Sequence, residues 1–133
     1  MKENEIEFIA VKVKCSKQKP FVYLNVYKPP KVTSEDFETS FRTAVKDLLK
    51  IGLEIFIAGD LNVNLHVKTK SSKSLSSVSK SLSLTQLIEE PTRVNARCSS
   101  LLDHMYVTTP NNIIESGVIR VGFSDHDAIF AIR

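Results

Sequence analysis

Alternating apolar and polar residues in the first third of the chain predict two strands. Apolar side chains mark Ile6–Val13, where the alternation slips at 9–10 and predicts a bulge. A polar turn over Lys14–Pro20 leads to a second strand over Phe21–Tyr27, and the Pro29–Pro30 pair ends it. We therefore expect these two strands to pair as a hairpin.

After the Pro29–Pro30 pair, the spacing of the apolar residues changes to that of a helix. Thr33–Asp36 resembles a capping box with acidic residues in the first turn, and Gly52 is a plausible C-cap. Between them lies one apolar stripe, made of Phe37, Phe41, Ala44 or Val45, Leu48 and Leu49. The short run Leu53–Ala58, rich in β-branched and aromatic residues, predicts a buried strand directly after the helix.

The second half begins with a biased segment, residues 66–83, which holds eight serines, four lysines and no acidic residue. We expect a Ser/Lys-rich loop there, although the spacing of Leu75, Val78 and Leu82 also fits a helix ending near Glu90. Three further strands follow, at Leu101–Val107, Gly117–Val121 and Ala128–Ile132, with a loop over Thr108–Glu115. A strand pair, a helix and more strands indicate a layered α/β domain.

Composition narrows the class of protein. The 133 residues have room for one domain, and 42% hydrophobic content supplies a core. No apolar run approaches the ~20 residues of a membrane span, and the charged start, residues 1–5, does not resemble a signal peptide. Cys15 and Cys98 are too few for a disulfide framework or a zinc site. We expect an intracellular protein of the nucleus or cytoplasm, without a membrane partner.

Polar residues whose side chains could take part in catalysis lie at the ends of predicted strands. Asp60 and Asn62 follow the buried strand, and persisting strand geometry would place both side chains on one face. Such a pair suits proton transfer and oxyanion binding, although Gly, Asp and Asn also form ordinary turns. Asp103 lies on an otherwise apolar strand face and needs a partner. The Asp125–His126 pair precedes the last strand.

These motifs together resemble the endonuclease/exonuclease/phosphatase superfamily. Gly-Asp-Leu-Asn-Val-Asn at 59–64, Ser-Leu-Leu-Asp-His-Met at 100–105 and Ser-Asp-His-Asp at 124–127 occur in the family's order and spacing. Asn-Val-Tyr-Lys-Pro-Pro at 25–30 and Glu-Pro-Thr-Arg at 90–93 are similar to the branch found with reverse transcriptases of non-LTR retrotransposons. The resemblance covers essentially the whole chain. It implies a DNase I-like α/β (α+β) sandwich, with mixed or antiparallel sheets flanked by helices.

The resemblance also implies roles for individual residues. Asp60 matches the carboxylate that activates water, Asn62 and Tyr27 match phosphate contacts, and His126 matches the imidazole on the scissile phosphate. Asp103 matches the carboxylate that orients that histidine, which agrees with its need for a partner. Asp125 matches an acidic residue near the divalent metal. His104, Asn64 and Asp127 match no such role, and we expect them to be exposed or structural.

The implied reaction is hydrolysis of a DNA phosphodiester with Mg²⁺, or Mn²⁺ as an alternative, by a nicking endonuclease whose parent polyprotein carries a reverse transcriptase domain. Complete family members begin with strands that bear a metal-binding Glu, and nothing here matches them. We therefore expect residues 1–133 to be one partial domain, with weak Mg²⁺ binding, an uncovered apolar face and impaired activity.

Three alternatives stay open at this point. The chain could be a non-catalytic, transposon-derived remnant. It could be a nucleic-acid-binding module that uses the lysine-rich segment, in which Lys68, Lys70 and Lys73 would contact phosphates; otherwise these lysines form a solvated surface. A phosphatase acting on inositol phosphates or lipids would share the same site, so the preference for DNA rests on analogy.

Overall fold

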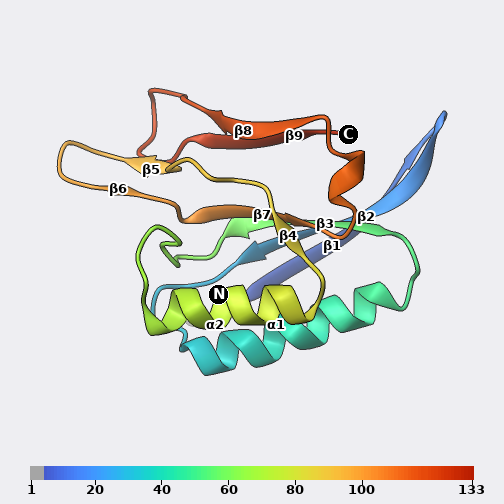
Figure 1. Ribbon diagram of the computed structural model, residues 1–133, viewed down its shortest axis with the longest axis horizontal. Coiled ribbons are helices and arrows are strands. Elements are labelled where there is room, and N and C mark those ends of the chain that lie inside the picture. Colours follow the sequence, from blue (N-terminus) through green and yellow to red (C-terminus); the bar gives the residue numbers. More distant parts are fainter. Residues whose placement is uncertain (1–4) are drawn as a thin grey trace.

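The computed structural model describes residues 5–133 as a layered α/β sandwich (Figure 1). The expectation about a charged chain start falls mostly on residues 1–4, which lie outside the described part. The elements in chain order are β1 (Glu7–Cys15), β2 (Gln18–Tyr27), α1 (Ser34–Leu49), β3 (Glu54–Asp60), α2 (Lys70–Ser81), β4 (Thr85–Gln86), β5 (Arg93–Val94), β6 (Ser99–Ser100), β7 (Asp103–Val107), a 3-10 turn (Pro110–Asn112), β8 (Glu115–Ile119) and β9 (Ala128–Ile132).

A five-stranded sheet forms the central layer, in the order β1-β2-β3-β7-β4. The β2–β3 pair is parallel and the other pairs are antiparallel, so the sheet is mixed. Strands β8 and β9 form a separate antiparallel pair on the opposite side of this sheet from the helices (Figure 1), and β5 and β6 form a small hairpin. The predicted layered α/β sandwich is confirmed.

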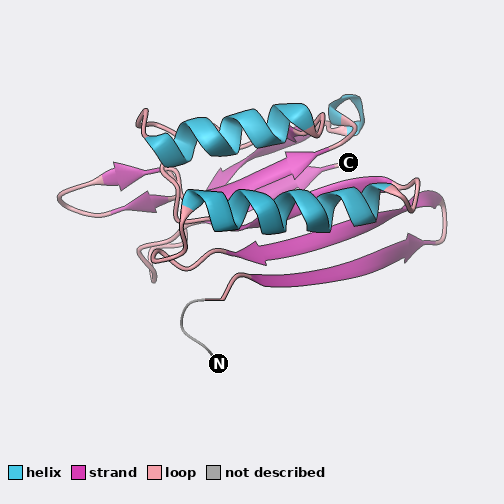
Figure 2. Cartoon of the chain, turned by 90° about the horizontal axis from the view of Figure 1, so that it is seen from below, coloured by secondary structure: helices cyan, strands magenta, loops and turns pink. Residues whose placement is uncertain are grey.

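Helix α1 covers one face of the sheet beside α2 (Figure 2). The Thr33 side chain accepts a hydrogen bond from the Asp36 amide, so the predicted N-terminus is confirmed. Phe37, Phe41 and Val45 are buried against the sheet, as their spacing predicted. Gly52, with a φ of +72°, follows the helix end at Lys50 and turns the chain into β3.

Helix α2 contradicts the expected loop over most of residues 66–83. Thr69 and Ser72 form a reciprocal capping box, and a periodic face with Leu75 and Val78 is buried. Serine hydroxyls that would oppose burial donate to backbone carbonyls instead, as Ser79 does to Leu75. The alternative helix was correct in place but wrong in extent: it ends at Ser81, and Ser83 takes a φ of +56° before β4.

Smaller corrections concern strand boundaries. Strand β1 pairs regularly with β2 from Glu7 to Val13, so the bulge expected at 9–10 is wrong; the irregularity lies between Val13 and Cys15. The turn between them is much shorter than Lys14–Pro20, because β2 already begins at Gln18. Strand β7 begins at Asp103, since Ser99 and Ser100 pair with β5, and β8 spans Glu115–Ile119 instead of 117–121.

The β8–β9 layer covers only part of the second sheet face. A cluster of Ala58, Ile88, Leu101 and Met105 is buried under it. On β1, in contrast, Ile9 and Val11 are 61% and 48% exposed, which is the uncovered apolar surface that we expected. In the described part of the chain, neither helix has the length and apolar character to cross a membrane.

Candidate active site

Strands β3 and β7 bring two acidic residues together where the strands meet. In the antiparallel register Gly59 is opposite His104, and Asp60 is opposite Asp103. Gly59 is required for this arrangement, because a Cβ built on it would lie 1.8 Å from the Val26 carbonyl oxygen of β2. Its φ of +153° also disfavours any L side chain. The glycine therefore lets β3 pass close to β2 and deliver Asp60 to the site.

Asn62 completes a turn directly after Asp60. Its φ is +48°, so the strand does not continue and the expectation that both side chains share a strand face is wrong. The Asn62 amide donates to Asp60 Oδ1 at 2.9 Å, and its side-chain Nδ2 donates to the Lys28 carbonyl at 2.9 Å. The turn interpretation and the site interpretation are therefore compatible, because an Asx-type turn holds the Asp60 carboxylate.

Asp103 and His126 form a hydrogen-bonded pair. His126 Nδ1 lies 2.8 Å from Asp103 Oδ2, with the two side chains 31% and 16% exposed. His126 is positioned by the loop before β9, where its own amide donates to Ser124 Oγ at 3.1 Å. A carboxylate on Nδ1 fixes the tautomer and leaves Nε2 for another partner. This is the partner that Asp103 needed on its apolar strand face.

Thr92 is a site residue that our sequence analysis did not single out. It is fully buried, and its hydroxyl donates to Asp103 Oδ2 at 2.6 Å. The Thr92 hydroxyl oxygen also accepts hydrogen bonds from the amides of Leu102 and Asp103, at 3.2 and 2.9 Å. In the sequence, only the motif at 90–93 pointed to this segment, and that motif gave no reason to choose Thr92 from its four residues. Thr92 thus holds Asp103 in place from behind.

One ligand atom from each of Asp60, Asp103 and His126 lies within 4.8 Å of the others. Burial raises the pKa of Asp60, and the charge of Asp103 raises it further. The Asn62 amide, His126 and Arg93 oppose that rise in pKa. The site therefore combines a half-buried carboxylate of raised pKa with an oriented imidazole, which is the combination expected for proton transfer beside an anion.

The donor set fits a divalent cation. Asp60 Oδ1 accepts one amide, and the described residues give its second oxygen no hydrogen bond, whereas Asp103 Oδ2 already accepts from Thr92 and His126. A hard cation such as Mg²⁺ needs only one or two protein carboxylates and keeps several waters. The free oxygen of Asp103 or that of Asp60 supplies such a carboxylate. The cluster can therefore hold a divalent metal ion without breaking the Asp103–His126 pair.

Asp125 and Tyr27 lie outside this tight cluster. The Asp125 carboxylate is 51% exposed and accepts from Arg93 Nε at 2.9 Å. That hydrogen bond lowers the pKa of Asp125. Tyr27 is the last residue of β2 and is 39% exposed; the next amide, that of Lys28, donates to the Asp60 carbonyl. The metal role of Asp125 and the phosphate role of Tyr27 stay predictions.

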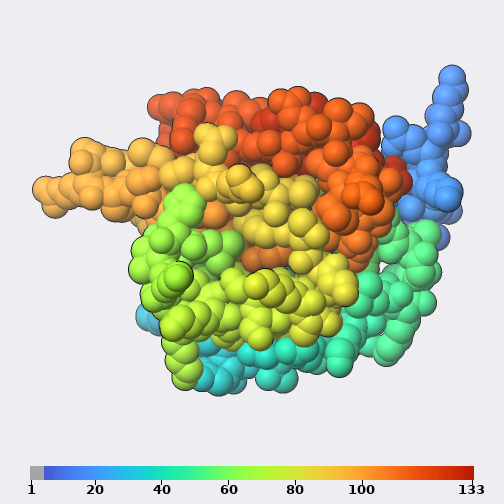
Figure 3. Space-filling view, viewed as in Figure 1, coloured from blue at the N-terminus to red at the C-terminus, as the bar shows by residue number. Residues whose placement is uncertain are grey.

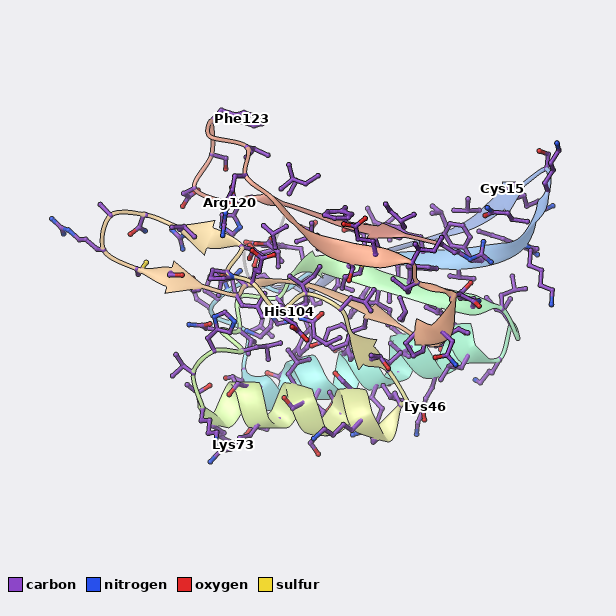
Figure 4. All side chains as sticks on the ribbon, turned by 45° about the horizontal axis from the view of Figure 1, so that its top comes forward. Cys15, Lys46, Lys73, His104, Arg120 and Phe123 are labelled. Carbon is purple, nitrogen blue, oxygen red and sulfur yellow. The ribbon has the colours of Figure 1, made fainter. Side chains whose placement is uncertain are left out.

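The lysines of the Ser/Lys-rich segment lie on the helix layer. Lys70 pairs with Glu35 of α1, whereas Lys68 and Lys73 line a shallow concavity of about 550 Å³ with Lys80. Figure 4 shows Lys73 on the helix side of the molecule, with His104 between it and Arg120. Lys70 thus has an ion-pair partner within the helix layer, and the contact of all three lysines with nucleic acid stays a prediction.

Three polar residues near the site have structural partners, as expected. His104 is 1% exposed, and its Nε2 lies 3.0 Å from the Val63 carbonyl. Asn64 Oδ1 accepts the amides of His66 and Leu101, both at 3.1 Å. Asp127 pairs with Arg120. These contacts hold the loops around the site.

Comparison with known proteins identifies the family. The model of the endonuclease-reverse transcriptase family matches residues 21–130 of this chain. No curated protein sequence matches it. Among solved structures, the endonuclease domain of TRAS1, a telomere-specific non-LTR retrotransposon, superposes with a TM-score of 0.79 at 18% identity. That match covers 92% of this chain and 61% of the TRAS1 domain.

Two phosphatases share the fold at lower similarity. A 3′ phosphatase, NExo, from Neisseria, solved with a product DNA hairpin, gives a TM-score of 0.65 at 12% identity, over 96% of this chain and 70% of that one. A mannosyl-6-phosphatase from Bacteroides thetaiotaomicron gives 0.62 at 17% identity, over 86% and 52%. The protein is therefore a member of the endonuclease-reverse transcriptase family and carries the DNase I-like fold of endonucleases, exonucleases and phosphatases.

Proposed function

We propose that this protein is the catalytic part of a Mg²⁺-dependent endonuclease that nicks DNA, from a retrotransposon-type polyprotein that also carries a reverse transcriptase. The observation that supports the proposal best is the placement of Asp60 within 4.8 Å of the hydrogen-bonded Asp103–His126 pair. A free carboxylate beside an oriented imidazole is the minimum needed to activate water next to a phosphate.

Asp60 is the general base of the proposed reaction. Its Oδ1 is held by the Asn62 amide, so its other oxygen is available to take a proton from water. The water oxygen attacks phosphorus opposite the 3′ oxygen and the P–O3′ bond breaks. The leaving 3′ oxygen takes a proton from solvent, so that a 5′ phosphate and a 3′ hydroxyl result. A Mg²⁺ ion held by the free oxygen of Asp103 would supply Lewis-acid stabilisation of the charge that develops on the phosphate and on the leaving oxygen.

His126 binds the scissile phosphate through Nε2. The Asp103 carboxylate holds the ring through Nδ1, so that in its protonated form the ring donates a charge-assisted hydrogen bond from Nε2 to a phosphate oxygen. Thr92 keeps Asp103 aimed at His126 through its 2.6 Å hydrogen bond. Asn62 and Tyr27 are the further phosphate contacts, and Asp125 is a second carboxylate for the metal.

The chain spans 61% of the length of the TRAS1 domain that it matches, so the activity is a property to test in the chain itself. The experiment is conversion of supercoiled plasmid to nicked circle, with Mg²⁺, Mn²⁺ or EDTA. Because activity is expected to be impaired in this chain, we expect slow metal-dependent nicking at high protein and metal concentration, which Asp60→Asn and His126→Ala each reduce at least about 100-fold. His66→Ala, an exposed histidine hydrogen-bonded to the Glu89 carbonyl, is the matched control and should nick normally.

Wild-type protein that binds DNA but does not nick it with either metal would refute the proposal and favour a non-catalytic remnant or a binding module. Hydrolysis of sugar or inositol phosphates without DNA nicking would favour the phosphatase alternative instead. All three alternatives keep the fold and differ in what the protein binds or hydrolyses, so assays on the same purified protein decide among them.

A further inference from the structure

Arg93 lies beside the proposed active site and is used by no step above. It comes from β5, at the base of the hairpin that projects from the molecule, which is the light-orange extension at the left of Figure 3. Its backbone forms an antiparallel bridge with His126, while Thr92 and Val94 on either side exchange backbone hydrogen bonds with Asp127 and Asp125. Residues directly opposite each other in such a ladder project to the same face.

The guanidinium of Arg93 is only partly engaged. Its Nε donates to Asp125 Oδ2 at 2.9 Å, and its side chain is 40% exposed. In the described part of the chain no other hydrogen bond involves this side chain, so both Nη groups remain available as donors. Guanidinium presents its N–H groups in a rigid planar fork that matches phosphate oxygens.

The carboxylates around the site repel an anion, so a phosphate bound there needs positive charge beside it. Asp60, Asp103 and Asp125 bring three carboxylates to the site, and a substrate phosphate adds further negative charge. His126 supplies positive charge only when protonated, whereas an arginine stays charged at every working pH. The Arg93 charge reaches Asp60, because it acts to lower the pKa of that residue.

We propose that Arg93 is a substrate-binding residue of the active site: its Nη groups bind a non-bridging oxygen of the DNA phosphate held by His126, while Nε keeps Asp125 in place. This inference rests on the proposed function, since it assigns a further contact to the same phosphate. Because the backbone of Arg93 pairs with that of His126, Arg93 also connects the base of the β5–β6 hairpin to the loop before β9.

The test compares Arg93→Gln with Arg97→Gln, which removes the same charge four residues away in the same hairpin but outside the cluster. DNA affinity is measured by fluorescence anisotropy of a labelled duplex with EDTA, and nicking is measured with Mg²⁺. We expect Arg93→Gln to weaken binding about tenfold and to lower kcat as well. Arg97→Gln should leave kcat unchanged, and Arg93→Lys should restore part of the binding.

If Arg93 only held Asp125 in place, without contacting DNA, its variants would behave differently. If Arg93→Gln lowers the melting temperature while Arg93→Lys restores both stability and full affinity, the residue acts through Asp125 and the inference is wrong. Equal affinity and equal kcat for Arg93→Gln and wild type would also overturn it, as would wild-type protein that binds no DNA at low salt. Arg93-dependent binding without any nicking would refute the proposed function and leave this inference standing.

Discussion

Protonation of His104 should weaken the fold as the pH falls from 7 to 4.5. The ring is 1% exposed between β7 and the loop after β3. Its Nε2–H is shared by the carbonyls of Val63 and Leu101, at 3.0 and 3.2 Å, and the Tyr106 hydroxyl lies 3.3 Å from Nδ1. The neutral ring is thus fully hydrogen-bonded, and a second proton would place an uncompensated charge in the core.

The magnitude follows from the pKa. Burial lowers the pKa of His104 from 6.5 to about 4. As the pH drops below 6.5 the unfolded chain binds a proton that the folded chain refuses, so stability present above pH 6.5 is lost toward pH 4. At ~1.36 kcal/mol per unit, the loss between pH 7 and pH 4.5 is roughly 2 kcal/mol, a large part of a typical domain stability.

The assay is urea unfolding at both pH values. His104→Gln keeps a side-chain donor but cannot titrate, so its free energy of unfolding should fall by roughly 2 kcal/mol less than that of wild type over this interval. His66→Gln, which changes an exposed histidine, should keep the wild-type pH dependence. Equal pH dependence of wild type and His104→Gln would refute the assignment of a buried neutral ring.

Three further predictions follow from single contacts. Gly59→Ala should lower the free energy of unfolding in urea by more than ~3 kcal/mol, because its Cβ meets the Val26 carbonyl. The control Gly122→Ala, whose Cβ has nothing within 4 Å, should lower it by about 1 kcal/mol. Equal losses would contradict the close contact between β3 and β2. Thr92→Val should slow nicking about 10–100-fold by freeing Asp103, and Thr92→Ser should restore it; an unchanged Thr92→Val rate would remove Thr92 from the site. Lys73→Ala should lower the salt dependence of DNA binding by about one phosphate contact, and no change in slope would leave that lysine a solvated surface residue.

Elements whose apolar residues repeat at a regular spacing were predictable from the sequence. The α1 stripe needed only its own spacing, because Phe37, Phe41 and Val45 repeat on one helical face. Helix α2 was expected mainly as a loop, because serine and lysine dominate its composition. Its buried face can contain serine because hydroxyls such as that of Ser79 donate to a backbone carbonyl, here that of Leu75, which composition does not reveal.

The candidate site was predictable as a set of residues but only partly as a geometry. Asp103 on an apolar strand face needed a partner, and the structure places His126 there at 2.8 Å. The conformation of Asn62 depends on the Lys28 carbonyl, which is distant in sequence, so strand alternation failed for it. Thr92 and Arg93 gained their importance from strand pairing across the 92–94 and 125–127 segments, which local sequence patterns do not encode.

The most direct test of the proposed chemistry is the origin of the oxygen in the product. Nicking with Mg²⁺ in ¹⁸O-labelled water, followed by mass analysis of the DNA ends, should give a 3′ hydroxyl and a 5′ phosphate that carries one ¹⁸O, and Asp60→Asn should abolish that product. A 3′ phosphate, an unlabelled 5′ phosphate, or labelled product formed equally well by Asp60→Asn would contradict water activation by Asp60.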